Sequence, residues 1–469
     1  MIRPGEGVTL SVFDPAAERR DALRTDLYQV TMMAAMHVAG VDHEATFELT
    51  TRRLAPRRGY WVACGLELAL EYLEGLRFDP AQVAWLRAHP AFKAVPDDFF
   101  AMLADFRFTG EVWAPAEGTP VFPQEPLLRV TAPAIQAQLV ETYLLSLVNF
   151  QTLVASKAAR VRRACRGKAF IDFGTRRAHG PEAGELVARA CYLAGAKGTS
   201  NVEAGLRLGV PVFGTFAHSW VMMWDDEGEA FRRYAQAFPD ATTLLIDTYD
   251  TVAAARRIVA EGLPCRAVRI DSGDLGALAR EVRRVFDEGG RGEVQIVLSG
   301  DLNEEKVDAL ERAGGAADVY GVGTELAVSK DLPSLGGVYK VVETRHGDQV
   351  RHPVKLSADK QTWPGKKQVW RRVEGGVARG DVIALADEAA PGPGHEPLLE
   401  RVMLGGRRAR PAPALADLRA RCLARVDALP PEVLAIEDPG PYPVRMSPGL
   451  LALAEEARAA VRARLEEGR

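Results

Sequence analysis

The chain has 469 residues, 47% of them hydrophobic, so it is long enough to bury a large core and to fold into two or three domains. Lys and Arg number 59 and Asp and Glu 63, which gives a formal net charge of −4 at pH 7. This balance provides no general attraction to nucleic acid or to an anionic membrane. We therefore expect neither as a partner, and any anionic ligand must be held locally.

The five cysteines are scattered and odd in number, which predicts neither a disulfide framework nor a zinc site. The first residues lack the apolar stretch of a signal peptide, and no later run approaches the roughly 20 apolar residues of a membrane span. These features lead us to expect a cytoplasmic protein with reduced thiols.

Residues 1–165 mix helical patterns with isolated strand patterns, such as EATFEL from residue 44 and EVWAPAEGTPVF from residue 111. They predict an N-terminal α+β domain. Its last part, Ile135 to Arg163, is expected to be a long helix that leads into the next domain.

Residues 166–335 alternate short β-branched runs with amphipathic helices, the pattern of parallel βα units. One helix is expected from Pro181 to Gly195, and another from Leu275 with an apolar stripe that leaves Arg283 and Arg284 in water. The expected strands are Ala169–Phe173, Lys197–Thr199, Pro211–Gly214, Thr243–Ile246, Arg266–Ile270, Val294–Leu298 and Asp318–Gly321. About seven strands predict an α/β catalytic domain built as an irregular, incomplete β/α barrel.

Residues 336–397 are expected to add strands to the α+β domain, together with a basic loop around Lys355 to Arg372. That loop is either a mobile lid over phosphates or a solvated segment, and the sequence does not choose. Residues 398–469 are rich in Ala, Arg and Leu and predict a C-terminal helical segment, whose role stays open.

Reactive residues of βα barrels lie where strands end and loops begin. Charged residues, glycines and hydroxyls follow four of the expected strands, so we expect them to share one rim. These turns are Asp172–Arg177, Arg269–Asp274, Ser299–Asp301 and Gly321–Thr324. Two of them, LSGDLN and GVGTEL, place flexible backbone just before a helix, where N–H groups attract phosphate. Each turn alone is explained better by tight packing, but their succession favours phosphate binding.

Arg269 and Asp271 are two residues apart at a strand end, hence on one side of the strand, where a guanidinium can bind a planar carboxylate through two hydrogen bonds. The alternative is that they pair with neighbours while Asp274 caps the next helix. We favour function for Arg269 and Asp271, and the cap for Asp274.

Phe173 and Arg176 have a similar placement, since an aromatic ring can stack on a flat ligand and a guanidinium can hold an anion. A strand-end phenylalanine is, however, more often part of the core. His218 stands at a glycine-containing turn before a helix, and its spacing does not choose among an acid, a base, a nucleophile and a structural role.

Six motifs resemble, in order, those of the nicotinate phosphoribosyltransferases, over roughly residues 25 to 325. They are TDLYQVT from Thr25, FIDFGTRR from Phe170, GTSNV from Gly198, GT-x-AHS from Gly214, VRIDSGD from Val268 and YGVGT from Tyr320. The resemblance implies the type II phosphoribosyltransferase fold, an irregular barrel of about seven strands packed with an α+β domain. It also implies a homodimer whose active sites lie between subunits.

The same resemblance implies roles for individual residues. Tyr28 of one subunit and Phe173 of the other would sandwich the pyridine ring of nicotinate, while Arg269 pairs with its carboxylate beside Thr215. Asp271 would help to orient the reacting centre. Phosphoribosyl pyrophosphate would be held by Arg176, Ser299, Gly300, Asp301, Gly323 and Thr324.

ATP is the implied co-substrate, and Mg²⁺ would neutralise the pyrophosphate, although the sequence leaves the metal ligands open. His218 would accept a phosphoryl group from ATP, and cleavage of the phosphohistidine would be coupled to the formation of nicotinate mononucleotide, the first step of NAD salvage from nicotinate. This chemistry is that of a ligase-type phosphoribosyl transfer.

Ser200 bears on the substrate. Related nicotinamide enzymes carry an aspartate there, which would repel nicotinate, so serine favours the acid over the amide. The alternatives are a nicotinamide or quinolinate phosphoribosyltransferase on the same fold, a non-catalytic ligand-binding relative and an aldolase-like barrel. The expected strand ends show no Schiff-base lysine for an aldolase.

Overall fold

The computed structural model describes residues 21–356 and 363–467, and the chain divides into two compact units. One contains Val154–Pro333 and Ile436–Asp438, and we call it the barrel unit. The other contains the rest of the described chain, and we call it the mixed unit. The four segments expected from the sequence are a finer division and stay predictions.

The sheet of the barrel unit has six parallel strands in the order β7-β6-β11-β10-β9-β8. They are β6 (Ala169–Asp172), β7 (Gly198–Thr199), β8 (Thr243–Leu245), β9 (Ala267–Ile270), β10 (Gln295–Leu298) and β11 (Val319–Val322). The expected strand Pro211–Gly214 is only an isolated parallel bridge between Val212 and Thr199. A proline has no N–H for a ladder, which limits pairing there. The irregular, incomplete barrel of about seven strands is thus confirmed.

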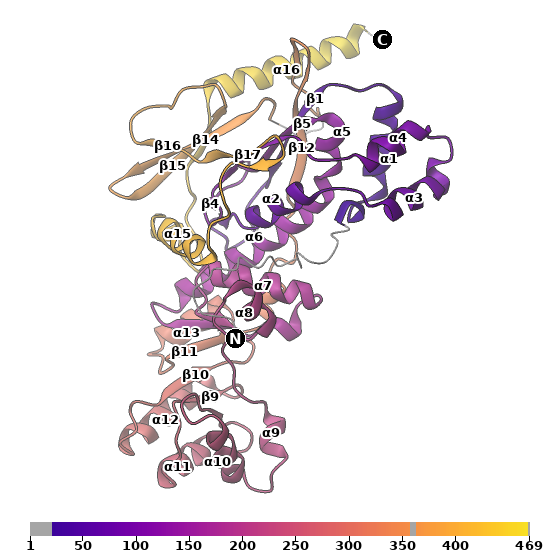
Figure 1. The fold of residues 1–469 in the computed structure, drawn as a ribbon. Coiled ribbons are helices and arrows are strands. Elements are labelled where there is room, and N and C mark those ends of the chain that lie inside the picture. Colours follow the sequence, from indigo (N-terminus) through magenta and orange to yellow (C-terminus); the bar gives the residue numbers. More distant parts are fainter. Residues whose placement is uncertain (1–20, 357–362, 468–469) are drawn as a thin grey trace. The chain divides into compact units, whose positions relative to one another are not determined.

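Helices alternate with these strands in the barrel unit (Figure 1). They are α7 (Pro181–Leu193), α8 (Val202–Leu208), α9 (His218–Met222), α10 (Glu227–Ala237), α11 (Thr251–Ala260), α12 (Leu275–Glu288), α13 (Glu304–Arg312) and α14 (Thr324–Ala327). Helix α7 has the expected limits, with Gly195 at φ 119° just past its end. Helix α12 buries Ala279, Val282 and Phe286, and Arg283 is half-buried because it donates to the Val294 carbonyl. The prediction that Arg283 faces water was wrong.

Two antiparallel-rich sheets form the mixed unit. The larger has the order β13-β12-β1-β5-β3-β17-β18, and the smaller the order β16-β14-β15-β19. Their strands are β1 (Glu44–Thr50), β3 (Glu111–Pro115), β5 (Pro126–Pro133), β12 (Val338–His346), β13 (Gln349–Arg351), β14 (Lys367–Glu374), β15 (Val377–Leu385), β16 (His395–Pro397), β17 (Leu399–Leu404), β18 (Arg407–Arg408) and β19 (Val444–Met446). A short pair, β2 (Trp61–Val62) and β4 (Pro120–Val121), stands apart.

The helices of the mixed unit are α1 (Leu27–Val38), α2 (Leu66–Gly75), α3 (Pro80–Ala88), α4 (Asp97–Ala104), α5 (Ala134–Leu139), α15 (Leu415–Asp427) and α16 (Pro448–Glu467), and α6 (Glu141–Ala164) leads into the barrel unit. The single helix expected from Ile135 to Arg163 is therefore two helices. No helix within the two described ranges is long and apolar enough to cross a membrane.

Two predictions for the second half of the chain need correction. The part of the expected basic loop from Lys367 to Arg372 lies in strand β14, where Lys367 is buried against Glu48, with 2.9 Å between Nζ and Oε2. Residues 357–362 of that loop lie outside the described residues, so the lid stays a prediction only for the segment before Lys367. The expected C-terminal helical segment holds α15 and α16 but also β17, β18 and β19.

Candidate active site at the rim of the half-barrel

A cavity of about 330 Å³ lies inside the curled sheet. Its walls are mostly apolar, with Ile171, Val297 and Val319 from three strands and the ring of Phe173. Three cationic residues also line it, Lys197, Arg266 and Arg269, and of these Arg269 lies at the rim beside Phe173. A flat, apolar ring with one anionic substituent fits these walls.

Phe173 has room over the sheet because Gly321 faces it from β11. A Cβ on Gly321 would stand 2.5 Å from the phenyl ring, so any larger residue would displace the ring. The Arg269 guanidinium carbon lies 5.6 Å from the ring centroid, within range of a cation–π contact. The aromatic ring and the guanidinium expected to bind the ligand are therefore neighbours.

Arg269 also pairs with neighbouring residues, as in the alternative interpretation of this motif. Its Nε donates to Ser299 Oγ at 2.8 Å, and its Nη2 donates to Asp271 Oδ1 at 2.6 Å. Ser299 Oγ donates to the same Asp271 oxygen at 2.5 Å. Nη1 has no partner among the described residues, so the guanidinium is held in place and keeps a donor for a ligand.

The carboxyl group of Asp271 is held in its ionised form. Burial by itself raises its pKa, but hydrogen bonds from Ser299 and Arg269, with the positive charge of Arg269 and the electrostatic effect of the nearby His218 ring, bring the pKa below the ordinary value. Asp271 is therefore a stable anion at the rim at neutral pH.

Asp247 belongs to the same cluster, although it is not among the residues expected from the sequence. It follows β8, and its Oδ2 accepts from the Asp271 N–H at 2.9 Å and from Ser272 Oγ at 2.6 Å. Its Oδ1 is buried and has no hydrogen-bond partner within the described ranges. The signal that sequence reasoning missed is a carboxylate directly after an expected strand of the barrel, at the same rim as the others.

His218 opens helix α9, and its side chain is half-buried. Its Nδ1 lies 3.2 Å from Thr248 Oγ, one residue beyond Asp247. Thr215, which lines the cavity, donates from Oγ to the Thr243 carbonyl at 2.6 Å. The imidazole thus lies at the β8 end of the rim, next to the two carboxylates.

The loop after β10 contains two consecutive residues with left-handed backbone. Gly300 has φ 94°, and a Cβ there would lie 1.9 Å from the Asp271 carbonyl oxygen, so only glycine fits. Asp301 is also left-handed, at φ 44°, and its carbonyl accepts from Lys306 Nζ at 2.6 Å. In the neighbouring loop, Gly323 and Thr324 lead into α14 directly after β11.

The remaining expected residues lie at the edges of this rim or outside the barrel unit. Arg176 is exposed in a short 3-10 helix, Thr175–Arg177. Ser200 is half-buried, and its N–H donates to the Asp172 carbonyl at 2.8 Å. Tyr28 is 48% exposed on α1 of the mixed unit. Its pairing with Phe173 of another subunit stays a prediction.

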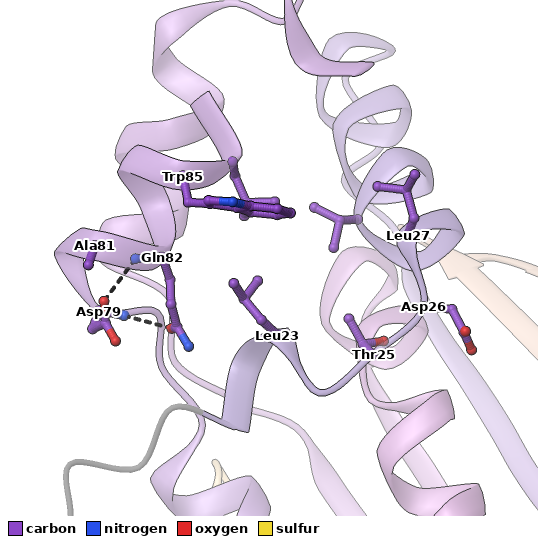
Figure 2. A pocket seen from close by; sticks show the side chains of 10 residues that line it. Leu23, Thr25, Asp26, Leu27, Asp79, Ala81, Gln82 and Trp85 are labelled. Carbon is purple, nitrogen blue, oxygen red and sulfur yellow. Dashed lines mark hydrogen bonds between the residues drawn. The ribbon is translucent and has the colours of Figure 1, made fainter. Parts of the chain in front are cut away.

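A second cavity, of about 460 Å³, lies in the mixed unit beside the start of α1. Figure 2 shows Leu23, Leu27 and Trp85 around it, with Gln82 and Asp79 joined by hydrogen bonds at one edge. Its walls are apolar, and none of the residues expected to carry the chemistry lines it.

Magnesium was expected without named ligands. In the part of the chain that the structure describes, no group of three or more His, Cys, Asp or Glu residues is arranged to hold a metal ion. Mg²⁺ commonly keeps several waters and uses one or two carboxylates together with substrate phosphates. Asp247, with its unpartnered buried oxygen, and Asp271 fit that requirement.

Comparison with solved structures gives the class of protein. The crystal structure of human nicotinic acid phosphoribosyltransferase is similar with a TM-score of 0.80 at 31% identity, over 92% of this chain and 99% of that one. Nicotinate-nucleotide pyrophosphorylase from Pyrococcus furiosus shares the fold, with a TM-score of 0.72 at 23% identity, over 89% of this chain and 97% of that one. The fold is that of the type II phosphoribosyltransferases.

Sequence comparison narrows the class to one family. Family profiles of nicotinate phosphoribosyltransferase match residues 23–149 as its N-terminal domain, 168–344 as the family itself and 394–454 as its C-terminal domain. The chain is 44% identical over 434 residues to nicotinate phosphoribosyltransferase pncB2 of Mycobacterium tuberculosis, covering 91% of each. It is 39% identical over 379 residues to the Bacillus subtilis nicotinate phosphoribosyltransferase, covering 78% of this chain and 76% of that protein. The chain belongs to the nicotinate phosphoribosyltransferase family.

Proposed function

We propose that this protein joins nicotinate to phosphoribosyl pyrophosphate, releasing pyrophosphate and forming nicotinate mononucleotide, in the first step of NAD salvage from nicotinate. The observation that carries the proposal is the Arg269 guanidinium, fixed by Ser299 and Asp271 beside the ring of Phe173 on the wall of an apolar cavity. It matches a planar aromatic acid, and the family membership points to nicotinate.

The chemistry needs alignment more than covalent help. The pyridine nitrogen is a free nucleophile and attacks the anomeric carbon of the ribose while pyrophosphate leaves, through a positively charged, oxocarbenium-like state. Phe173, Thr215 and Arg269 fix the ring and its carboxylate. Asp271, held ionised, supplies a negative charge near the carbon where positive charge develops.

The phosphates of the sugar donor are proposed to bind along the rim. The loop of Ser299, Gly300 and Asp301 and the turn of Gly323 and Thr324 follow neighbouring strands β10 and β11, so their backbone N–H groups are close together. Arg176, which is exposed, is free to reach a phosphate. Mg²⁺, when bound, neutralises the pyrophosphate, and Asp247 and Asp271 are the carboxylates suited to hold it.

ATP is the proposed co-substrate, and His218 the proposed phosphoryl acceptor. The half-buried imidazole stands at the rim with one nitrogen near Thr248, so its ring is oriented while the other nitrogen is available. ATP hydrolysis through this phosphohistidine would be coupled to nucleotide formation. We further propose a cytoplasmic homodimer in which Tyr28 of one subunit completes the nicotinate site of the other.

The test is an assay of purified protein with phosphoribosyl pyrophosphate, Mg²⁺ and either nicotinate or nicotinamide, with and without ATP. We expect nicotinate mononucleotide from nicotinate, with stimulation by ATP in the wild type and none in His218→Ala. Product from nicotinamide alone would overturn the inference from Ser200. Absence of product from either substrate would favour a non-catalytic relative.

A further inference from the structure

Behind the two phosphate loops lies a buried group of charges that the proposed chemistry does not use. Lys157 of helix α6 has no exposed surface, and its Nζ lies 2.8 Å from Glu304 Oε2, 2.8 Å from Asp331 Oδ1 and 3.6 Å from Glu325 Oε2. Arg160, one turn further along α6, places its Nε 3.0 Å from the other oxygen of Glu304. All of these residues belong to the barrel unit.

The positions of the carboxylates connect this cluster to the rim. Glu304 is the first residue of α13, directly after the loop that begins at Ser299. Glu325 is the second residue of α14, directly after Thr324. Lys157 therefore joins the first turns of two helices whose preceding loops follow the adjacent strands β10 and β11.

A buried lysine is costly unless it is paired, and replacing a buried ion pair by apolar residues is often neutral or stabilising. Stability alone therefore gives little reason for a fully buried Lys157 among three carboxylates. Anion binding gives a better one. Carboxylates in the first turns behind the loops would oppose an incoming phosphate, and a cation between them offsets their charge and fixes the spacing of the loops.

We propose that Lys157 is a positioning residue for the phosphate-bearing substrate. It touches no substrate itself, but it neutralises Glu304 and Glu325 and sets the two loops at the separation that the phosphates require. This inference rests on the proposed function, because it needs the loops of Gly300 and Thr324 to bind phosphoribosyl pyrophosphate.

The experiment is a comparison of Lys157→Met with the double variant Lys157→Met/Glu304→Gln. In the single variant a buried carboxylate loses one of its cations, and we expect KM for phosphoribosyl pyrophosphate to rise by about tenfold or more. KM for nicotinate should change by less than about twofold, since Arg269 and Phe173 are untouched. The double variant removes one positive and one negative charge, so the cluster keeps the net charge of the wild type, and KM for phosphoribosyl pyrophosphate should return to within about threefold of wild type.

Lys168→Met is the matched control. Lys168 Nζ pairs with Glu311 near the other end of α13 at 2.8 Å, so its loss removes a lysine–glutamate contact of the same helix without touching the loops. Its KM for phosphoribosyl pyrophosphate should be that of the wild type. Equal rises of both KM values in Lys157→Met, a fall in kcat alone, or no recovery in the double variant would overturn the positioning role.

Two further measurements keep the proposal testable. If Lys157→Met does not fold, Asp331→Asn removes a partly exposed carboxylate from the same ammonium group. An unchanged or raised KM for phosphoribosyl pyrophosphate would then count against the proposal, and a selective fall of about threefold would support it, because one carboxylate no longer competes for the Lys157 charge. If the wild type forms no product, the proposed function fails separately. In that case the increase in Tm caused by phosphoribosyl pyrophosphate with Mg²⁺ tests the role of Lys157. This increase should be smaller in the Lys157 variant than in the wild type.

Discussion

Arg269 combines two features that a lysine does not reproduce, a planar fork of donors and a flat face near Phe173. We expect Arg269→Lys to lower kcat/KM for nicotinate by about 100-fold, because the ammonium group loses the two-point contact with a carboxylate and the hold from Ser299. Steady-state kinetics check this. Arg284→Lys, on the exposed side of α12, is the control, and equal activity of the two variants would refute the assignment of Arg269.

Gly300 is the residue whose identity the fold constrains most directly at the rim. Alanine there meets both a positive φ and the Asp271 carbonyl at 1.9 Å, whereas alanine at Gly290 meets only φ 68° with no atom within 4 Å. We expect Gly290→Ala to lower the free energy of unfolding by about 1 kcal/mol without affecting activity. Gly300→Ala should cost more and lower kcat/KM by at least about tenfold, since its loop must move. Urea unfolding and kinetics distinguish the two, and equal effects would remove the special role of Gly300.

The sequence distinguishes some site residues from structural residues, and it fails to distinguish others. Arg269, Asp271 and Phe173 were expected together because each directly follows or ends a strand. Asp247 and Asp250 stand three residues apart after β8. The first holds the neighbouring loop at Asp271 and Ser272, and the second caps α11 through the N–H groups of residues 252 and 253. Nothing in their local sequence distinguishes a contact between loops from a helix cap.

Strands β6 and β7 are joined at their carboxyl ends by Asp172, which is fully buried. Its Oδ2 accepts from Thr199 Oγ at 2.7 Å, and its Oδ1 accepts from the Gly174 N–H at 2.8 Å. Burial raises the pKa of Asp172 from 3.8 to about 6, although both hydrogen bonds act in the opposite direction. Because the folded state binds this proton more tightly, the group's stabilising effect is complete below pH 3.8 and is lost as pH rises through about 6.

Asp172→Asn should remove that dependence. The variant's free energy of unfolding, relative to the wild type, should increase by up to about 3 kcal/mol between pH 4 and pH 7.5, which corresponds to a shift of roughly two pKa units. Urea unfolding of both proteins across this range measures the difference and cancels the other titrating groups. A difference that stays constant with pH would show that Asp172 titrates normally in the fold.

Element prediction succeeded where one physical signal dominated. The buried parallel strands of the barrel unit read as short β-branched runs, and α7 is framed by Pro181 and Gly195. It failed where pairing decides structure. Strand β17, LERVML, is half-exposed and lacks the strict alternation of a half-buried strand, and it forms because β3 is available to pair with it. Likewise, two basic residues of β14, Lys367 and Arg371, form buried pairs with Glu48 and Asp381 rather than parts of a loop.

On the scale of the whole molecule, the order of the motifs in the sequence indicated the fold class. In the structure these motifs are divided between the two units. Tyr28 lies on α1 of the mixed unit, whereas Phe173 and Arg269 lie in the barrel unit. Nearly half of the Tyr28 side chain is exposed in the single chain. A ring that must cover a ligand is therefore available to another copy of the chain, as the proposed homodimer requires.

Subunit complementation tests this arrangement. Tyr28→Ala and Arg269→Ala should each be nearly inactive, but in a mixed dimer one of the two sites receives an intact Tyr28 from one chain and an intact Arg269 from the other. Random exchange after mild denaturation and refolding of equal amounts should restore about one quarter of wild-type activity, because half of the dimers are mixed and each has one intact site.

The control mixes Arg269→Ala with Asp271→Ala. Both residues belong to the barrel unit, so each chain of a mixed dimer has a defective barrel unit and neither site is intact. That mixture should stay inactive. If the first mixture also stays inactive although sedimentation shows that dimers exchange, Tyr28 serves the barrel unit of its own chain, and the site is complete within one subunit. Recovery in the first mixture alone would place the catalytic site between two copies, with each chain's mixed unit closing the other's half-barrel.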